Sequence, residues 1–95
     1  MSNEEFWKNH PNPYPMKKFR FNDDFTVDVT FLDGKAKRYN VKPYVARLPM
    51  IRYLLDSIEL FKHPKELAED AIRWDDNADI TAEWIYEDGV DIEPF

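Results

Sequence analysis

The side chains best suited to bind a metal form an acidic cluster near the end of the chain. Residues 75–79 read Asp-Asp-Asn-Ala-Asp, which places oxygen ligands at positions 1, 3 and 5 of a calcium-binding loop. The rest of that loop is missing, because Ile80 stands where its sharp turn requires glycine and Tyr86 where it requires a bidentate glutamate. We therefore interpret the cluster as a turn whose acidic side chains accept hydrogen bonds from backbone N–H groups, with Asp79 favouring the start of the next helix. A weak surface cation site is the alternative.

The remaining candidates for catalysis are few and poorly placed. His10 and His63 each precede a proline in a predicted loop, and the chain has no cysteine that could complete a zinc site. Ser2 lies close to the N-terminus and Ser57 is predicted to cap a helix, so neither has the setting of a nucleophile. Two glycines cannot form a glycine-rich phosphate loop. These features predict a protein that is not an enzyme and has no cofactor, with a weakly metal-dependent or unrecognised enzyme as an alternative.

The elements that position these residues belong to one small domain. The chain has 95 residues, of which 43% are hydrophobic and 16% aromatic, enough for one core without a metal or a disulfide. No apolar segment approaches the length that spans a bilayer, and Met1–Trp7 is acidic and polar, unlike a signal peptide. Together with the absence of cysteine, this predicts a cytoplasmic protein without a membrane partner.

Charge is distributed unevenly along the chain. The net charge is −6, but residues 17–52 contain nine basic and four acidic side chains, whereas residues 70–95 contain nine acidic and one basic. Two interpretations remain open at this point. Either the two segments fold against each other and partly cancel, or they form complementary patches that meet another subunit or a partner protein.

Alternating apolar residues predict three antiparallel strands, followed by helical patterns. The strands cover residues 16–21, 25–31 and 35–41, with a tight hairpin at Asp33–Gly34. In the second strand Thr26, Asp28 and Thr30 face away from the apolar side. Next, residues 50–58 are predicted as a helix and residues 58–61 as a short helix capped by Ser57. Residues 65–70 are predicted either as a helix or as the lead into a strand at residues 72–74. The last helix is predicted at residues 82–87, capped by Thr81 and ended by Gly89.

The whole pattern predicts an α+β fold. Its antiparallel sheet has three to four strands, a meander plus a later strand, with short helices packed on one face. The domain is expected over residues 16–90. Residues 1–15 are expected as a flexible or extended arm because prolines alternate there, with a docking role for its aromatic side chains as the alternative. Residues 91–95 are expected as a tail.

Several fragments occur in an order that resembles a known bacterial family. They are the hairpin Val27–Gly34, the segment Tyr39–Pro43, Leu55-Asp56 with Phe61, Ile72-Arg73-Trp74, and the terminal set Asp79-Ile80, Glu83, Ile85-Tyr86-Glu87 and Gly89. Together they resemble the family named domain of unknown function 2442. Asn40, Ala78 and Ile85 depart from its preferred aspartate, glycine and leucine. The resemblance implies an antiparallel sheet with short helices on one face, and no established activity from which residue roles could be carried over.

Two surfaces are candidates for contacts. Trp84 and Tyr86 lie two residues apart on a predicted helix, so one is expected to pack inward and the other outward. The candidate interaction surface contains Trp74, Asp75, Asp76, Asp79, Trp84 and Tyr86. The candidate basic face contains Lys17, Lys18, Arg20, Lys35, Lys37 and Arg38, with Phe19, Phe21 and Tyr39 between them as rings that could stack on bases. A pI of 4.8 argues against nucleic acid as the partner.

These features favour a non-enzymatic protein-interaction or oligomerisation domain. Its expected partner is itself, as a homodimer or a larger assembly, or another small protein. Some relatives lie beside toxin-like neighbours, so the resemblance suggests an antitoxin-like or regulatory role. A nucleic-acid-associated accessory domain that uses the basic strands is the alternative.

Overall fold

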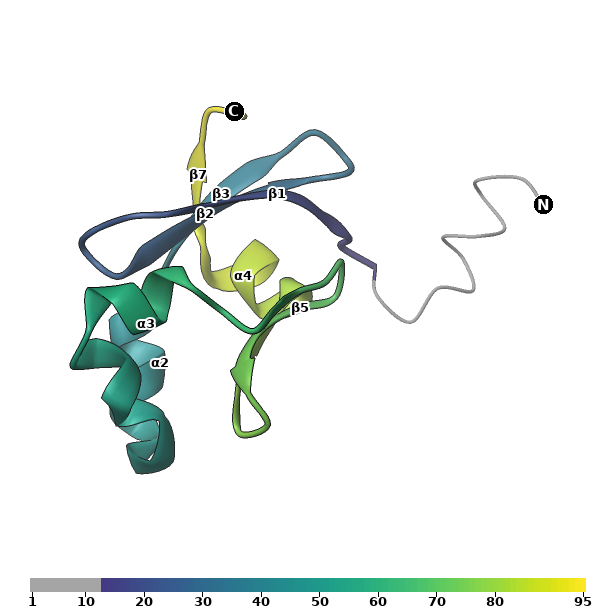
Figure 1. The fold of residues 1–95 in the computed structure, drawn as a ribbon. Helices are drawn as coiled ribbons and strands as arrows, with labels where there is room; N and C mark the ends of the chain where they lie inside the picture. Colours follow the sequence, from purple (N-terminus) through teal and green to yellow (C-terminus); the bar gives the residue numbers. More distant parts are fainter. Residues whose placement is uncertain (1–12) are drawn as a thin grey trace.

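The structure, a computed structural model, describes residues 13–95 and has the α+β fold that the sequence predicts (Figure 1). Its elements follow in the order β1 (Met16–Phe21), β2 (Thr26–Phe31), β3 (Ala36–Asn40), α2 (Val41–Arg47), the 3₁₀ helix η1 (Pro49–Leu55), α3 (Ile58–Lys62), β4 (Glu66–Leu67), β5 (Ala71–Asp75), β6 (Ala78–Thr81), α4 (Ala82–Asp88) and β7 (Val90–Ile92). The predictions for residues 1–12, which include Ser2 and His10, lie outside the described residues. None of the described helices has the length and apolarity that a membrane crossing requires.

The first sheet contains the predicted three-strand meander. Its order is β1-β2-β3-β7, and all neighbours are antiparallel. The hairpin between β2 and β3 turns at Gly34, whose φ of +93° is a left-handed conformation that glycine adopts without strain. Asp33 Oδ1 accepts a hydrogen bond from the Lys35 N–H at 2.9 Å and closes this turn. The preceding turn reaches one residue further than predicted, because Phe25 has a positive φ of 62° and β2 begins at Thr26.

A second, three-stranded sheet follows, in the order β4-β5-β6. The strand predicted at residues 72–74 lies here, in β5, and does not extend the first sheet. Residues 65–70 contain the two-residue strand β4, which pairs with β5. β5 then pairs with β6 across the acidic cluster, so the chain forms a hairpin before α4 begins. The sequence pattern showed one strand here because β4 and β6 are too short for a clear alternation.

The expected C-terminal tail contains the last strand of the first sheet. β7 pairs with the edge of β3, and its three residues are too few to show an alternating pattern in the sequence. Gly89 joins α4 to β7 with an ordinary negative φ of −73°. Its role is steric, because a Cβ at this position would lie 2.5 Å from the Ile85 carbonyl oxygen and 2.9 Å from Lys37 Cβ. Glycine therefore allows the end of α4 to approach β3 closely.

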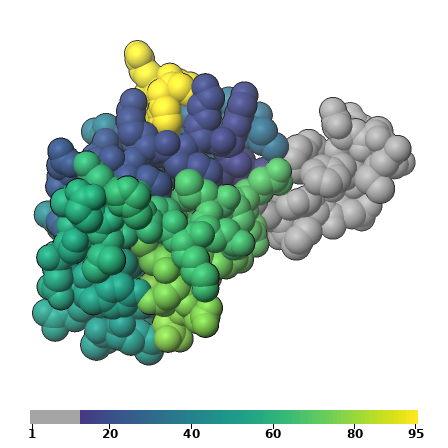
Figure 2. Space-filling model, in the orientation of Figure 1, coloured from purple at the N-terminus to yellow at the C-terminus, as the bar shows by residue number. Residues whose placement is uncertain are grey.

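One core lies between the inner face of the first sheet and the elements packed beneath it. Figure 1 shows α2, α3, α4 and the second sheet on the same side of the first sheet. The largest fully buried apolar side chains come from nearly all of these elements: Phe31, Ile51, Leu54, Phe61, Ile72, Ile80 and Ile85. In the space-filling view, β1 to β3 (purple to blue) and the C-terminal residues (yellow) lie above the helices and the second sheet (teal to yellow-green) (Figure 2).

Side-chain caps fix where the helices begin. Ser57 Oγ and Thr81 Oγ1 accept hydrogen bonds from N–H groups three residues further on, at 3.4 and 3.3 Å, so both predicted caps are confirmed. Asn40 Oδ1 accepts a hydrogen bond from the Lys42 N–H at 3.1 Å, which starts α2 directly after β3. The cap at Thr81 sets the start of α4 and therefore the direction in which Trp84 points.

Candidate functional site

Trp74 belongs to the core and not to the predicted interaction surface. The residue is 8% exposed, and its ring stacks on Phe61 with ring centroids 5.9 Å apart. Its Nε1–H donates a hydrogen bond to the Phe61 carbonyl oxygen at 2.8 Å, so the polar edge of the indole is satisfied inside the protein. The structure corrects the predicted surface at this position, because Trp74 holds β5 against α3 and is out of a partner's reach.

The acidic cluster divides between a hairpin turn and a strand. Asp75 Oδ1 accepts a hydrogen bond from the Asn77 N–H at 2.7 Å, and Asp75 Oδ2 accepts one from the Tyr53 hydroxyl. The predicted turn with an acidic side chain bonded to backbone is therefore present. Asp79 lies exposed within β6, two residues before the Thr81 cap and outside the first turn of α4. Within residues 13–95, no group of three or more His, Asp or Glu side chains could hold a metal ion.

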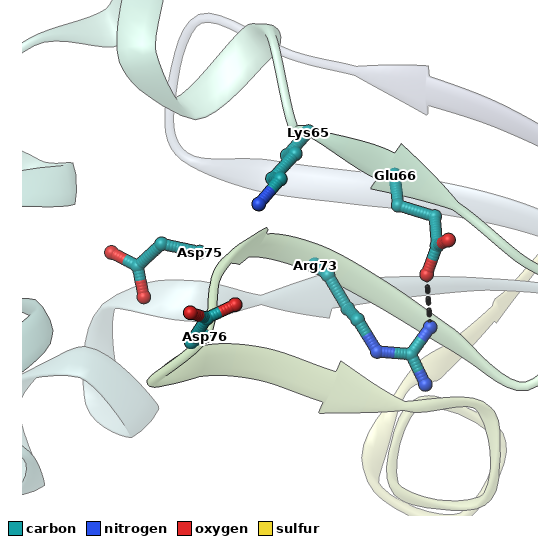
Figure 3. Close-up of a pocket in the computed structure, with 5 residues that line it drawn as sticks. All are labelled: Lys65, Glu66, Arg73, Asp75 and Asp76. Carbon is teal, nitrogen blue, oxygen red and sulfur yellow. Dashed lines mark hydrogen bonds and ion pairs between the residues drawn. The ribbon is translucent and has the colours of Figure 1, made fainter.

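A hollow of about 280 Å³ beside this hairpin is lined by charged side chains (Figure 3). Its lining consists of Lys65, Glu66, Arg73, Asp75 and Asp76. Arg73 forms ion pairs with Glu66 and, at 3.5 Å, with Asp70. The hydrogen bond that Arg73 donates to the Glu66 carboxylate raises the pKa of Arg73 above its ordinary value. Because charges of both signs share this wall, the hollow offers a small ion little net attraction.

Trp84 is the aromatic residue of the predicted surface that faces outward. It is 39% exposed on α4, and its ring packs against Tyr44 at 5.1 Å with an interplanar angle of 79°. Tyr44 is itself fixed, because its hydroxyl donates a hydrogen bond to the Asp79 carbonyl oxygen at 2.6 Å. An open groove of about 250 Å³ is lined by Thr81, Glu83, Trp84 and Glu87. Trp84 is thus an exposed ring in a fixed orientation with two carboxylates beside it.

Tyr86 faces the first sheet from the same helix. Its ring stacks on Tyr14 at 4.0 Å and meets Phe31 edge to face at 4.9 Å. Its hydroxyl donates a hydrogen bond to Asp33 Oδ2 at 2.8 Å. The two aromatic residues therefore divide as the sequence predicts, with Trp84 outward and Tyr86 packed against the sheet. Tyr86 joins α4 to the β2–β3 hairpin and is half-buried, so it is not part of the surface around Trp84.

Asp28 is a buried carboxylate held by two arginines on the outer face of the first sheet. Its side chain is 0% exposed, and Oδ2 accepts hydrogen bonds from Nε and Nη2 of Arg20 at 2.9 and 2.8 Å. Oδ1 accepts a hydrogen bond from Arg38 Nε at 2.8 Å. Burial alone would raise the pKa of Asp28, but the hydrogen bonds from Arg38 and Arg20 outweigh it and lower this pKa to about 2. We call these three residues the arginine clamp.

The six candidate basic residues do not share one face. Arg20 and Arg38 are engaged by Asp28, whereas Lys37 lies opposite Val29 in the register, on the inner face, and pairs with Asp91. The other three, Lys17, Lys18 and Lys35, are exposed on β1 and the β2–β3 hairpin. The rings between them, Phe19, Phe21 and Tyr39, pack in or against the core. The predicted platform for stacking bases is therefore absent from the described residues.

The acidic and basic segments of the chain form few direct ion pairs with each other. Within residues 13–95, the pair Lys37–Asp91 is the one ion pair that joins segment 17–52 to segment 70–95. In the same described part of the chain, Asp76, Asp79, Glu83, Glu87, Asp88 and Glu93 form no ion pair. Most of the negative charge of the C-terminal segment therefore remains at the surface.

A family model described as "Protein of unknown function (DUF2442)" matches residues 16–91, from β1 into β7. The chain belongs to this family. The match agrees with the resemblance predicted from the ordered fragments, and it covers both sheets and all described helices. No curated protein and no solved structure matches the chain. The family description names no activity, so the chemistry of this member follows from the geometry of its own side chains.

Two residues of this family member, Asp28 and Tyr44, have structural roles that the sequence did not predict. Asp28 was expected to face away from the apolar side, and the structure places Arg38 opposite it because a three-residue loop, Leu32-Asp33-Gly34, joins β2 to β3. Counting outward from the predicted two-residue turn at Asp33–Gly34 would place Tyr39 there instead. Arg20 lies opposite Asp28 on the other neighbouring strand. Tyr44 supports Trp84 across 40 positions of sequence, and no local pattern signals such a contact.

Proposed function

We propose that this chain is a non-enzymatic protein-interaction domain that contacts another protein through Trp84. The observation that carries the proposal is an exposed tryptophan whose orientation is fixed by Tyr44 and by the Thr81 cap. Tryptophan is among the residues most enriched at interaction hot spots, and a ring that is already ordered loses little entropy on binding. The open, shallow groove beside it can accommodate a side chain of the partner.

The proposed contact surface shares only Trp84 with the one predicted from sequence. It consists of the four residues that line the groove, Thr81, Glu83, Trp84 and Glu87, and we call it the Trp84 surface. Trp74 and Tyr86 are left out because both pack against other parts of the chain. An antitoxin-like or regulatory role, which the family resemblance suggested, is one use for such a surface. Nucleic acid is disfavoured as its partner because the surface carries the same sign of charge as phosphate.

Affinity capture with two matched variants tests this proposal. Proteins that bind the immobilised chain are identified by mass spectrometry, and the predominant partner is purified and titrated. We expect Trp84→Ser to weaken binding more than about tenfold, because truncating a hot-spot side chain costs about 2 kcal/mol or more. Leu60→Ser is the control, because Leu60 is another exposed large apolar residue, on α3. Unchanged affinity in Trp84→Ser would contradict the proposal.

A second copy of the chain is a separate outcome of the same experiment. Sedimentation velocity of the wild type, Trp84→Ser and Leu60→Ser distinguishes self-association through the Trp84 surface from binding of another protein. Urea unfolding of each variant confirms that a loss of binding is not a loss of folding. A strictly monomeric wild type that also captures no partner through Trp84 would leave the proposed function without support.

A further inference from the structure

We infer that the partner at the Trp84 surface presents a basic segment, with an arginine or lysine side chain placed over the indole of Trp84 between Glu83 and Glu87. This inference rests on the proposed function and names the chemistry of its partner. It starts from an ordered aromatic ring that lines one hollow together with two carboxylates. Tryptophan is the best aromatic receptor for a cation, and guanidinium groups use it most often.

The positions of the two glutamates on α4 suit one shared cation. Glu83 and Glu87 are four residues apart on a helix, so they lie on the same side, one turn apart. Trp84 lies one residue after Glu83 and three before Glu87, and all three line the same groove. A cation that contacts the indole face is therefore within reach of both carboxylates. A single Arg or Lys side chain would form an ion pair and a cation–π contact at once.

The charge on α4 is unsatisfied within the described part of the chain. Glu83, Glu87 and Asp88 make no ion pair there, and the last turn of the helix contains no basic residue. Glu87 and Asp88 also lie at the C-terminal end of the helix, where the helix dipole is negative and a carboxylate is unfavourable. A cation from a partner would relieve this repulsion. The electrostatics of the helix end thus favour a basic partner independently of the indole.

A basic protein fits this surface better than a second copy of the chain. In a two-fold symmetric dimer the Trp84 surface would meet itself, so that Glu83 and Glu87 of one copy would face the same residues of the other. Like charges placed opposite one another at an interface are unfavourable.

Nuclear magnetic resonance with a defined peptide tests the inference without knowledge of the natural partner. The probe is an acetylated Gly-Arg-Gly-Arg-Gly peptide, and its control carries citrulline, the uncharged isostere, in place of arginine. We expect the arginine peptide to shift the indole N–H resonance of Trp84 saturably and the citrulline peptide to leave it in place. Trp74 is an internal control, because its Nε1–H is bonded to the Phe61 carbonyl oxygen inside the core.

Charge-matched variants separate this site from general attraction to an acidic protein. Glu83→Gln/Glu87→Gln should weaken peptide binding about fivefold, and Trp84→Leu about two- to fivefold, from typical energies of exposed ion pairs and cation–π contacts. Asp56→Asn/Glu93→Gln removes the same charge away from α4 and should change the affinity less than about twofold. Equal weakening by both double variants, or no shift of the Trp84 resonance, would overturn the inference.

The two proposals fail in distinguishable ways. If the arginine peptide does not bind but Trp84→Ser still abolishes capture of a partner protein, the basic-segment inference is wrong and the proposed function stands. If Trp84→Ser changes neither capture nor peptide binding, both are wrong. If the purified partner binds through Trp84, the inference further requires that neutralising Glu83 and Glu87 weakens that complex and that added salt weakens it as well.

Discussion

Asp28 and Glu87 are both carboxylates of this small domain, but their surroundings are opposite. Asp28 is fully buried on the outer face of the first sheet and accepts hydrogen bonds from Arg20 and Arg38. Glu87 is exposed in the last turn of α4 and forms no ion pair within residues 13–95. The arginine clamp satisfies its charge inside the chain, whereas the Trp84 surface leaves its charge to solvent or to a partner.

This difference separates two uses of a charged side chain. A buried carboxylate that loses its partners is costly, so the clamp ties three strands into one register. An exposed carboxylate without a partner adds little to stability, and at the end of a helix it is unfavourable. Stability and binding should therefore respond to different residues. Substitutions in the clamp should destabilise the domain, and substitutions around Trp84 should change binding while the stability stays nearly the same.

Asp28→Asn should produce the largest loss of stability. The substitution keeps the shape of the side chain but removes the charge that Arg20 and Arg38 surround. Hydrogen bonds to charged groups contribute about 1.5–3 kcal/mol each, and the half-exposed arginines can regain water, so we expect a loss of about 2–3 kcal/mol. Urea unfolding at neutral pH measures it. Asp76→Asn, an exposed acid without an ion pair in residues 13–95, should change stability by less than about 0.5 kcal/mol, and a similar loss there would contradict the distinction.

The same clamp predicts how stability depends on pH. The pKa of Asp28 falls from 3.8 to about 2 on folding, so the unfolded chain takes up the proton first as the pH is lowered. The stabilisation is fully present above the unfolded pKa and is lost as the pH falls from about 4 to about 2, by about 2.5 kcal/mol at 1.36 kcal/mol per unit. Urea unfolding across this range should show a steeper loss for the wild type than for Asp28→Asn. If the unfolding free energies of the two proteins fell in parallel with pH, the clamp would not lower the pKa of Asp28.

Gly89 lies between α4, which contains Trp84, and β7, which joins the sheet that contains the arginine clamp. Gly89→Ala would place a Cβ 2.5 Å from the Ile85 carbonyl oxygen and 2.9 Å from Lys37 Cβ, so backbone must move. We expect a loss of about 1–2 kcal/mol in the free energy of unfolding, as in other overpacked sites. Asp88→Ala is the control, because Asp88 is the exposed neighbour at the end of the same helix. Equal stability of the two variants would contradict the close approach of α4 to β3.

Much of this fold could be predicted because its signals are local. The alternation in residues 25–31, the Asp33–Gly34 hairpin and the caps at Ser57 and Thr81 each depend on a few neighbouring residues. β7 could not be predicted, because three residues carry no pattern and the strand exists by pairing with β3. The burial of Asp28 could not be predicted from alternation either, since it depends on arginines contributed by two neighbouring strands.

The candidate site was predicted in part for the same physical reason. The sequence indicates that Trp84 and Tyr86 point to different sides of the helix. The apolar residues Ala82 and Ile85 mark the side that faces the core, so they could have shown that Tyr86 is the inward one. Tyr86 is one helical turn from Ala82 and follows it toward the sheet, whereas Trp84 lies on the other side. The burial of Trp74 was not predictable, because its partner Phe61 comes from α3 and only the assembled core brings them together.

The smallest expected effect is the change in unfolding free energy when a glutamate of α4 is neutralised. It tests the contrast between Asp28 and Glu87 sharply, because its sign should differ between the two ends of the helix. Glu83 lies in the first turn, where a carboxylate interacts favourably with the helix dipole, and Glu87 lies in the last turn, where it does not. Glu83→Gln should lower the free energy of unfolding by about 0.3 kcal/mol, and Glu87→Gln should raise it by a similar amount. Paired urea unfolding at low salt can resolve opposite signs, and both effects should shrink as salt is added. If Glu87→Gln is destabilising, the carboxylate of Glu87 stabilises the fold as that of Asp28 does, and the contrast between them is wrong. If it is stabilising yet weakens binding of the arginine peptide, the charge at Glu87 costs the fold stability and serves the contact at Trp84.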